Sequence, residues 1–223
     1  MKTRLSSFIK NNVGLTRSKL DQLFDNDLIT VNDHKVNLSY IIKETDIVKV
    51  NGVIIENKPF VYYLYNKPVG VISTNDTSIK ESYLNFINLD TRVFCVGRLD
   101  KLSCGLMLLT NDGKLADSLL NPETHVEKEY IITTYNEITD NFIEKMKGEI
   151  YLDNSLLKKV AVEIIDKYHF SIVLTEGKYH QIRRMVKICG NKVKELMRIR
   201  IAKLTLKDIK EGEVIQINKE SIN

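Results

Sequence analysis

The sequence predicts an α+β fold. Several apolar or alternating segments have the length of strands, and the helical segments between them do not alternate strictly with strands, which argues against a doubly wound parallel sheet. The chain has 223 residues, of which 43% are hydrophobic and 28% charged. It is therefore long enough to bury a core, either as one large domain or as two smaller ones.

Residues 1–24 predict two short helices separated by the segment 14–18, with Thr16 as a candidate N-cap of the second helix. Apolar residues recur at helical spacing in both. These residues are Leu5, Phe8 and Ile9 in the first helix and Leu20, Leu23 and Phe24 in the second.

Charge is unevenly distributed in this helical pair. Five basic residues precede the first acidic one: Lys2, Arg4, Lys10, Arg17 and Lys19. A basic helical face can hold phosphates, but an ordinary solvated face explains the same pattern.

The segments that follow predict a small sheet and a domain junction. Residues 28–31 and 47–50 have strand composition, and Asn51-Gly52 before the apolar residues 53–55 is a strong hairpin signal. Residues 56–60 then form a plausible junction. We therefore expect one domain at residues 1–58 and a second at residues 59–223.

The second domain predicts a mixture of strands and helices. Residues 181–190 are an example of a predicted helix, because apolar residues recur there at i, i+3, i+4 and i+7 and Gly190 suits a C-terminal cap. A turn is expected at residues 66–70. The other predicted helices are 114–120 and 137–147, and the predicted strands are 60–65, 71–72, 106–109, 129–134, 160–165, 170–174 and 214–217.

Composition narrows the possible environments and partners. The formal charge of +4 is only a weak indication of an anionic partner. Cys95, Cys104 and Cys189 are widely spaced, which argues against a disulfide framework and a zinc site and fits a reducing cytoplasm. The sequence has no apolar run long enough for a membrane helix and no signal-peptide core. We expect a cytoplasmic protein that does not bind a membrane.

The stretch 96–113 has an unusual order of parts. Gly97 and Gly105 flank a polar segment that holds Arg98 and Asp100, and a short apolar strand follows. A carboxylate on a loop before a buried strand has a rigid support near a place where a pocket can open. A surface aspartate in a glycine-flanked turn is the alternative interpretation.

Three ordered blocks resemble the pseudouridine synthases of the RsuA/RluB/RluF group. They are Gly97-Arg98-Leu99-Asp100 with Gly105-Leu106 and Thr110-Asn111-Asp112-Gly113, then His125-Val126-Glu127-Lys128-Glu129-Tyr130, then Glu176-Gly177-Lys178-Tyr179-His180-Gln181-Ile182-Arg183-Arg184-Met185. The N-terminal segment resembles an S4 RNA-binding domain. One departure is that Ser103 and Cys104 stand where the group usually has a threonine.

The resemblance implies both a fold and a reaction. It implies a small S4-like α/β domain, followed by a synthase domain with a mixed, mostly antiparallel sheet and a cleft across its middle. The reaction breaks the N1–C1′ bond of a uridine and rejoins the base through C5, without a redox change. No cofactor is therefore expected, and the nucleotide must be flipped out of its stack. No metal is expected either, because no histidine of the motif blocks has a partner at ligand spacing.

The resemblance assigns three catalytic residues. Asp100 carries over as the carboxylate that acts as nucleophile or charge stabiliser. Tyr130 offers a ring that can stack on uracil and a hydroxyl that can move protons, although from sequence alone a core aromatic is the commoner explanation. Arg183 supplies a cation that keeps a nearby carboxylate ionised.

Further residues are expected to contact RNA. These are Arg98, Arg17, Lys19, Lys128, His180, Gln181 and Arg184. Residues 178–203 form the densest basic stretch, in which only Glu195 opposes nine positive groups. Such a stretch can line a cleft and hold several phosphates.

The expected partner is ribosomal RNA, bound by a monomer. Arg92-Val93-Phe94, Lys101 and Ser103 most resemble the RluF subtype, with RluB close behind, which favours large-subunit RNA. Small-subunit RNA and transfer RNA remain open. Two other classes also remain: a non-catalytic RNA-binding protein, and a hydrolase that uses Asp100, which would need a second carboxylate.

Overall fold

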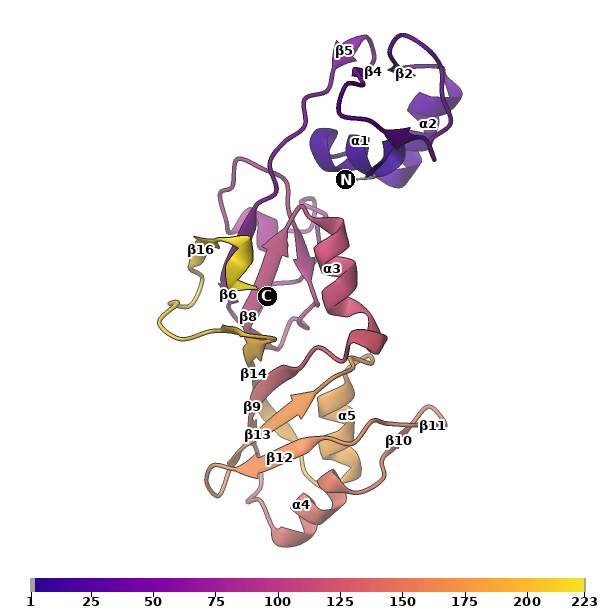
Figure 1. Ribbon diagram of the computed structural model, residues 1–223. Helices are drawn as coiled ribbons and strands as arrows, with labels where there is room; N and C mark the ends of the chain where they lie inside the picture. The colour runs from indigo at the N-terminus through magenta and orange to yellow at the C-terminus, as the bar shows by residue number, and fades with distance from the viewer. Residues whose placement is uncertain (1–2, 223) are drawn as a thin grey trace. The chain divides into compact units, whose positions relative to one another are not determined.

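The computed structural model describes residues 3–222, apart from the side chain of Pro122. The chain divides into two compact units with the boundary between Phe60 and Val61, two residues beyond the expected end of the first domain. Each unit has its own hydrophobic core. Figure 1 shows the helices and strands of both units.

The N-terminal unit packs two helices against short strands. Its elements are β1 (Thr3–Arg4), α1 (Leu5–Val13), α2 (Arg17–Asp25), β2 (Ile29–Val31), β3 (Ile41–Ile42), β4 (Val48–Val50) and β5 (Val53–Ile54). The Thr16 hydroxyl accepts a hydrogen bond from Lys19 N at 3.3 Å, which confirms the predicted cap of α2. The predicted hairpin is also confirmed, because β4 and β5 pair across Asn51-Gly52.

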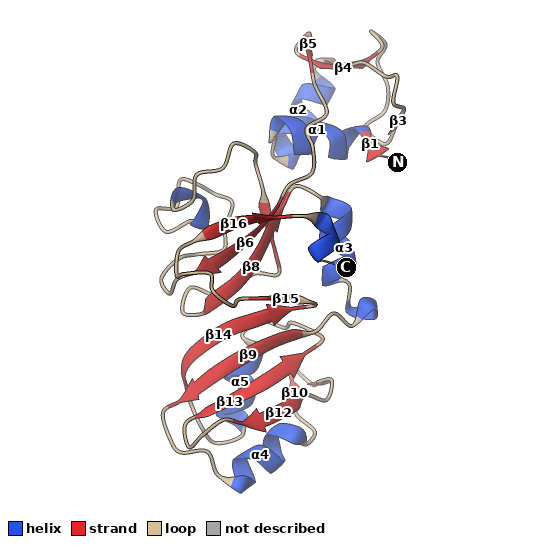
Figure 2. Cartoon of the chain, turned by 60° about the vertical axis from the view of Figure 1, so that its left-hand side comes forward, coloured by secondary structure: helices blue, strands red, loops and turns tan. Residues whose placement is uncertain are grey.

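The larger unit is built on one mixed sheet. Its strands are β6 (Tyr62–Lys67), β7 (Phe94–Val96), β8 (Cys104–Thr110), β9 (Lys128–Thr134), β12 (Ala161–Ile164), β13 (His169–Leu174), β14 (Val193–Ile201), β15 (Leu204–Thr205) and β16 (Val214–Ile217). The order is β12–β13–β9–β14–β8–β6–β16, while β15 pairs with β14 and β7 with β8. Strands β14, β9, β13 and β12 lie side by side in the lower half of Figure 2. A separate hairpin is formed by β10 (Tyr151–Leu152) and β11 (Ser155–Leu156).

The two halves of this sheet meet where β14 pairs with β8. That pairing is parallel, and the other strand pairings of the sheet are antiparallel. The expected mixed, mostly antiparallel sheet is therefore confirmed. Because the single parallel contact lies at the centre, residues from both halves come together there.

Helices cover both faces of the sheet. They are α3 (Gly113–Leu120), α4 (Asp140–Lys147) and α5 (Gln181–Ile188), with short 3₁₀ turns η1 (Tyr83–Asn85), η2 (Pro122–Thr124) and η3 (Lys219–Ser221). The cluster that holds α4 and α5 contains Met107 and Leu109, whereas the cluster that holds α3 contains Leu106 and Leu108. Strand β8 is thus buried on both sides, as its continuous apolar sequence predicts.

Some predicted boundaries were wrong. The turn expected at residues 66–70 begins later, because Asn66 and Lys67 still pair with β8. Lys67 is fully buried, and its Nζ donates to the carbonyls of Pro68 and Val71, at 2.7 Å each. The strand expected at residues 71–72 is only a single bridge between Ile72 and Ser82.

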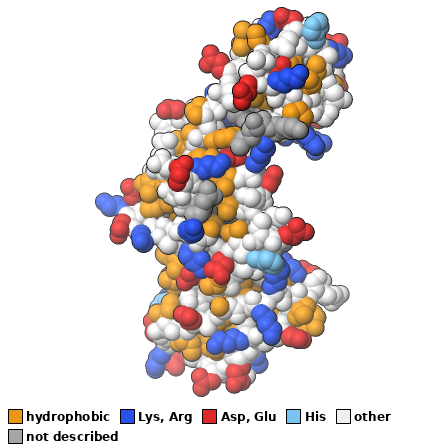
Figure 3. Space-filling model, viewed as in Figure 1, with side chains coloured by type: hydrophobic (Ala, Val, Ile, Leu, Met, Phe, Trp, Pro, Cys, Tyr) orange, Lys and Arg blue, Asp and Glu red, His pale blue; other side chains and the backbone are white. Residues whose placement is uncertain are grey.

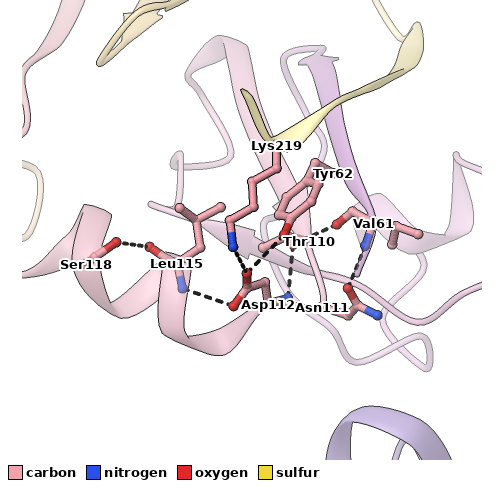
Figure 4. Close-up of polar contacts among 8 residues, drawn as sticks. All are labelled: Val61, Tyr62, Thr110, Asn111, Asp112, Leu115, Ser118 and Lys219. Carbon is pink, nitrogen blue, oxygen red and sulfur yellow. Dashed lines mark hydrogen bonds and ion pairs between the residues drawn. The ribbon is translucent and has the colours of Figure 1, made fainter. Parts of the chain in front are cut away.

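The turn after β8 joins three parts of the larger unit (Figure 4). The buried Asp112 carboxylate caps α3 by accepting from Leu115 N at 3.1 Å. It also accepts from the Tyr62 hydroxyl at 3.0 Å and from Lys219 Nζ at 3.2 Å. Burial raises the pKa of Asp112, but these donors outweigh burial and hold it below its usual value.

The same turn fastens the first strand of the unit. Val61 N donates to the Asn111 side chain at 2.9 Å, and the Thr110 hydroxyl donates to Val61 O at 2.7 Å. Asp112 N donates to that same hydroxyl at 3.0 Å. The Thr-Asn-Asp-Gly block therefore has a structural role, distinct from the cleft described below.

Asp112→Ala is expected to destabilise the larger unit by about 2–4 kcal/mol at pH 7. The loss combines about 1 kcal/mol for the helix cap with about 1–3 kcal/mol for a buried donor left without its acceptor. Because the folded-state pKa is lowered, the stabilisation is present above the ordinary aspartate pKa of 3.8 and is lost as pH falls through the folded value.

Urea unfolding of the unmodified protein and of Asp112→Ala, followed by circular dichroism at several pH values between 7 and 3, measures the difference in their free energies of unfolding. The difference in free energy of unfolding should narrow toward acid. A difference that stays constant with pH would show that the ionised carboxylate is not what stabilises this junction.

Candidate active site

A cleft of about 690 Å³ lies in the larger unit, beside the place where β14 meets β8. Its walls come from the loop before β8, the start of β9, the segment before α5 with the first turn of α5, and β14. Seven residues singled out from the sequence line it: Arg98, Asp100, Lys128, Tyr130, His180, Gln181 and Arg183. The structure thus brings together residues that are up to 85 positions apart (183 − 98 = 85).

Buried neighbours fix the loop that carries Asp100. Leu99 is buried in the core, and its backbone is held by Ser73, whose hydroxyl donates to Leu99 O at 2.7 Å and accepts from Leu99 N at 3.2 Å. Ser103 N donates to Asp100 O at 3.0 Å and closes the turn. With Leu99 directed inward, Arg98 is exposed and Asp100 is half-exposed at the cleft.

Arg198 of β14 fixes the start of this loop through hydrogen bonds. Its side chain is buried, and it donates through Nε to Leu106 O at 2.7 Å and through Nη2 to Gly97 O at 2.8 Å. Gly105 makes this approach possible: it pairs with Arg198, and a side chain at Gly105 would lie 2.3 Å from Arg198 O. Gly105 also has φ +101°, a conformation that strongly favours glycine.

Asp100 has two positively charged or chargeable neighbours. Its Oδ1 lies 3.5 Å from His180 Nε2, within ion-pair distance if the imidazole is protonated. Arg183 interacts with Asp100 through charge: burial lowers the pKa of the Arg183 guanidinium and the Asp100 carboxylate raises it. The guanidinium itself donates to Leu102 O at 2.7 Å and to the Ser103 hydroxyl at 3.3 Å.

Arg183 therefore has a wider role than the sequence suggested. The sequence predicts a cation near the carboxylate, and the structure also ties Arg183 to the turn that follows Asp100. Sequence reasoning missed His180 as a neighbour of Asp100, since the block of residues 176–185 gives no sign of which side chain lies nearest the carboxylate. Ser103, which keeps a hydroxyl at the departure from the group's threonine, accepts the bond from Arg183.

Tyr130 lies on β9 with its ring both in the core and at the wall of the cleft. Only 8% of the residue is exposed. It pairs with Ile172 on one side and with Arg198 on the other, so both neighbouring strands fix its backbone. Most of the Tyr130 side chain is therefore part of the core, as an ordinary strand aromatic would be. Its small exposed part borders the cleft, where a ring that stacks on uracil would have to lie.

Lys128 adds a second cation beside Arg198. Its Nζ donates to Val126 O at 3.2 Å, and burial together with the charge of Arg198 lowers its pKa. Both side chains approach Gly97. The floor of the cleft is therefore positive, which favours an anionic ligand.

Acidic side chains from outside residues 178–203 oppose two of the nine cations of this stretch, in addition to Glu195 within it. Arg184 forms a bidentate ion pair with Asp153, at 2.9 and 2.6 Å, and is not among the described residues that line the cleft. Arg200 binds Glu127 and Glu129. These acids come from distant segments, so counting charges along the chain could not reveal them.

Positive and negative side chains are mixed on one face of the molecule. On the face seen in Figure 3, Lys and Arg side chains lie among Asp and Glu side chains. Arg17 and Lys19 are exposed on α2 in the N-terminal unit. The weak net charge is therefore less informative than the local positive character of the cleft.

Within residues 3–222 there is no group of three or more His, Cys, Asp and Glu side chains arranged to hold a metal ion. The three cysteines have free thiols, and burial raises the pKa of each. None of the helices described above is long and apolar enough to cross a membrane.

Comparison with known proteins agrees with this geometry. Residues 61–187 match the model of the RNA pseudouridylate synthase family. The dual-specificity RNA pseudouridine synthase RluF of Escherichia coli O6:H1 is 36% identical over 213 residues, which cover 94% of this chain and 73% of the relative. The ribosomal small subunit pseudouridine synthase A of Pasteurella multocida is 31% identical, and the alignment covers 98% of this chain and 97% of the relative.

A solved structure supports the same assignment. A crystal structure of a pseudouridylate synthase superimposes with a TM-score of 0.71 at 30% identity, and the alignment covers 98% of this chain and 97% of that one. Sequence, fold and the residues gathered in the cleft thus agree. The chain belongs to the RNA pseudouridylate synthase family and is an enzyme that isomerises uridine in RNA.

Proposed function

We propose that this enzyme isomerises a uridine of ribosomal RNA, with large-subunit RNA as the first candidate, and that Asp100, Tyr130 and Arg183 carry the reaction. The observation that carries the site assignment is the position of Asp100. Its carboxylate is half-exposed at a positive cleft, on a loop held by Ser73 and Arg198. A rigid support of this kind is what a catalytic group requires.

The reaction is an intramolecular transfer of the base. The N1–C1′ bond breaks, the uracil turns, and a C5–C1′ bond forms; C5 then loses its proton and N1 gains one. Asp100 acts as the nucleophile or balances the positive charge that develops on the sugar. The products balance without an oxidant or reductant.

Tyr130 and Arg183 support this carboxylate in different ways. The Tyr130 ring holds the freed uracil by stacking, and its hydroxyl moves a proton at the sugar or base. Arg183 balances the charge of Asp100 and holds the following turn through Leu102 and Ser103. Arg183 is thus tied both to the charge and to the shape of the catalytic loop.

RNA binding is assigned to two surfaces. In the cleft, Arg98, Lys128, His180 and Gln181 contact the strand around the flipped nucleotide. In the N-terminal unit, Arg17 and Lys19 on α2 bind phosphates of the same RNA, as in an S4-like domain. Arg184 is left out of the RNA contacts because it is paired with Asp153.

The choice of ribosomal RNA rests on resemblance and on charge. The name of the Pasteurella relative specifies the ribosomal small subunit, whereas the Escherichia relative is named as a dual-specificity enzyme. The residues that flank Asp100 favour the RluF subtype and hence large-subunit RNA. Small-subunit RNA is the second candidate, because the Pasteurella relative matches over almost its whole length. We place the reaction in the cytoplasm and assign it to a monomer.

The purified protein is expected to form pseudouridine in large-subunit transcripts, and Asp100→Asn should lower the rate at least about 1,000-fold, because asparagine keeps the shape of the side chain but not its charge. RNA affinity should remain nearly unchanged. The assay compares large-subunit, small-subunit and transfer-RNA transcripts and measures pseudouridine and free uracil.

Other results of this assay would change the proposed substrate, the proposed reaction or the role of Asp100. Modification confined to the small-subunit transcript would replace the proposed substrate. Release of free uracil would indicate a hydrolase, and RNA binding without either product would indicate a non-catalytic protein. An Asp100→Asn enzyme that retains most of its rate would remove Asp100 from the reaction.

Replacing Arg17 and Lys19 together by Gln is expected to weaken RNA binding and to reduce its salt dependence. Each phosphate contact contributes about 0.7–0.9 to the slope of log affinity against log salt concentration, so the slope should become shallower by about 1–2. The matched control replaces Lys35 and Lys43, which are exposed in the same unit outside α1 and α2. Equal effects of both double variants would show a general charge effect instead of a contact by α2.

A further inference from the structure

Two aromatic side chains form a stacked pair in the lining of the cleft. The rings of Tyr179 and His180 lie with centroids 3.9 Å apart and planes inclined by 16°. Tyr179 is 77% exposed, so its ring is covered mainly on the side of His180. The imidazole in turn lies 3.5 Å from Asp100. The stacked pair thus connects the catalytic carboxylate to an open aromatic surface.

The backbone under this pair is held firmly. Lys178 N donates to the Gln181 side-chain oxygen at 2.8 Å, and Gln181 N donates back to Lys178 O at 3.1 Å. The Gln181 amide then donates to Glu176 at 2.8 Å. Gln181 is itself buried and begins α5, so the turn that carries Tyr179 and His180 is preorganised.

Flipping the target uridine exposes neighbouring nucleobases that could stack on the open face of Tyr179. Flipping a uridine out of its stack leaves the neighbouring bases without the face that covered them. Proteins that bind unstacked RNA place aromatic rings against such bases, and stacking is tolerant of sequence because every base has a π-face. An exposed ring pair next to Asp100 meets this requirement. The exposed Arg98 and the half-buried Lys178 line the same cleft and suit the phosphates of the same strand.

We propose that Tyr179, backed by His180, is a stacking platform for a nucleobase directly adjacent to the target uridine. This assignment rests on the proposed function, because it takes the RNA strand in the cleft as given. Tyr179 contributes affinity and position and takes no part in bond breaking. The platform gives the enzyme a contact with the substrate that is independent of the pocket for the flipped uracil.

The test measures RNA affinity in the Asp100→Asn protein, so that the RNA stays unmodified during the measurement. Tyr179→Ala should weaken binding of a stem–loop carrying the target by about 5- to 150-fold, which corresponds to the loss of about 1–3 kcal/mol of stacking. Tyr179→Phe should stay within about twofold, because the ring is kept. The control is Tyr151→Ala, which removes an exposed tyrosine on β10 outside the described lining of the cleft.

A second measurement locates the base. An RNA with an abasic residue next to the target uridine, on either side in turn, is bound to the protein that keeps Tyr179 and to the Tyr179→Ala variant. One of the two abasic RNAs should weaken binding to the protein that keeps Tyr179 by a similar factor and leave binding to the Tyr179→Ala variant almost unchanged. Such coupling isolates the contact between ring and base.

Several results would overturn the platform. These are equal abasic effects in both proteins, a loss in Tyr179→Phe as large as in Tyr179→Ala, or no loss in Tyr179→Ala. Pseudouridine formation by the unmodified protein is scored on the same stem–loop. If pseudouridine forms but Tyr179→Ala and the abasic substitution are not coupled, the platform is wrong and the proposed function stands. If the two changes are coupled but no pseudouridine forms, the proposed function is wrong and the contact between ring and base stands.

Discussion

The geometry of the cleft depends on one buried arginine. Arg198 extends from the central strand β14 and donates to the carbonyls of Leu106 in β8 and Gly97 in the loop that leads to Asp100. A guanidinium is costly to bury unless it is hydrogen-bonded, so these two carbonyls are what make its position favourable. The same side chain therefore joins the two halves of the sheet and fixes the start of the loop that carries Asp100. Its partner Gly105 leaves the space for the close backbone approach.

Other groups around this arginine give the cleft its electrical character. Lys128 lies nearby, and burial together with the charge of Arg198 lowers its pKa. Burial also lowers the pKa of Lys67 to about 8, against smaller opposing effects of Cys104 and Asp100. Lys128 and Arg198 thus line the cleft, and the buried Lys67 lies close enough to interact through charge with Asp100 and Arg198. A phosphodiester strand is the kind of ligand that this environment favours.

Sequence patterns predicted the elements well where the pattern was local. The hairpin at Asn51-Gly52, the cap at Thr16 and the closing strand β16 follow from neighbouring residues, and the structure confirms them. The short strand β7 was missed, because three residues carry too little periodicity. The parallel contact of β14 with β8 could not be predicted from local pattern, since it joins segments about 90 residues apart (197 − 104 = 93).

The sequence predicted which residues line the cleft better than it predicted their contacts. The motif blocks identified Asp100, Tyr130 and Arg183, and the structure gathers them at one cleft. Arg198 looked like one more member of a basic stretch. The sequence held one signal for its burial. Arg198 follows Leu196 by two positions, so in a strand its charged side chain lies on the same face as the buried leucine. Neither its bond to Gly97 nor the pairing of Arg184 with Asp153 can be derived from spacing.

The most direct test of this account is the rate of Arg198→Met set against its RNA affinity. Arg198→Lys is the matched variant, because lysine can still donate to Gly97 O. A misplacement of about 1 Å at the reacting centre costs about 100-fold in rate. We expect such a fall in kcat for Arg198→Met, partial recovery in Arg198→Lys, and RNA affinity within about threefold of the unmodified protein. A folded Arg198→Met enzyme with undiminished kcat would show that the position of Asp100 does not depend on this arginine.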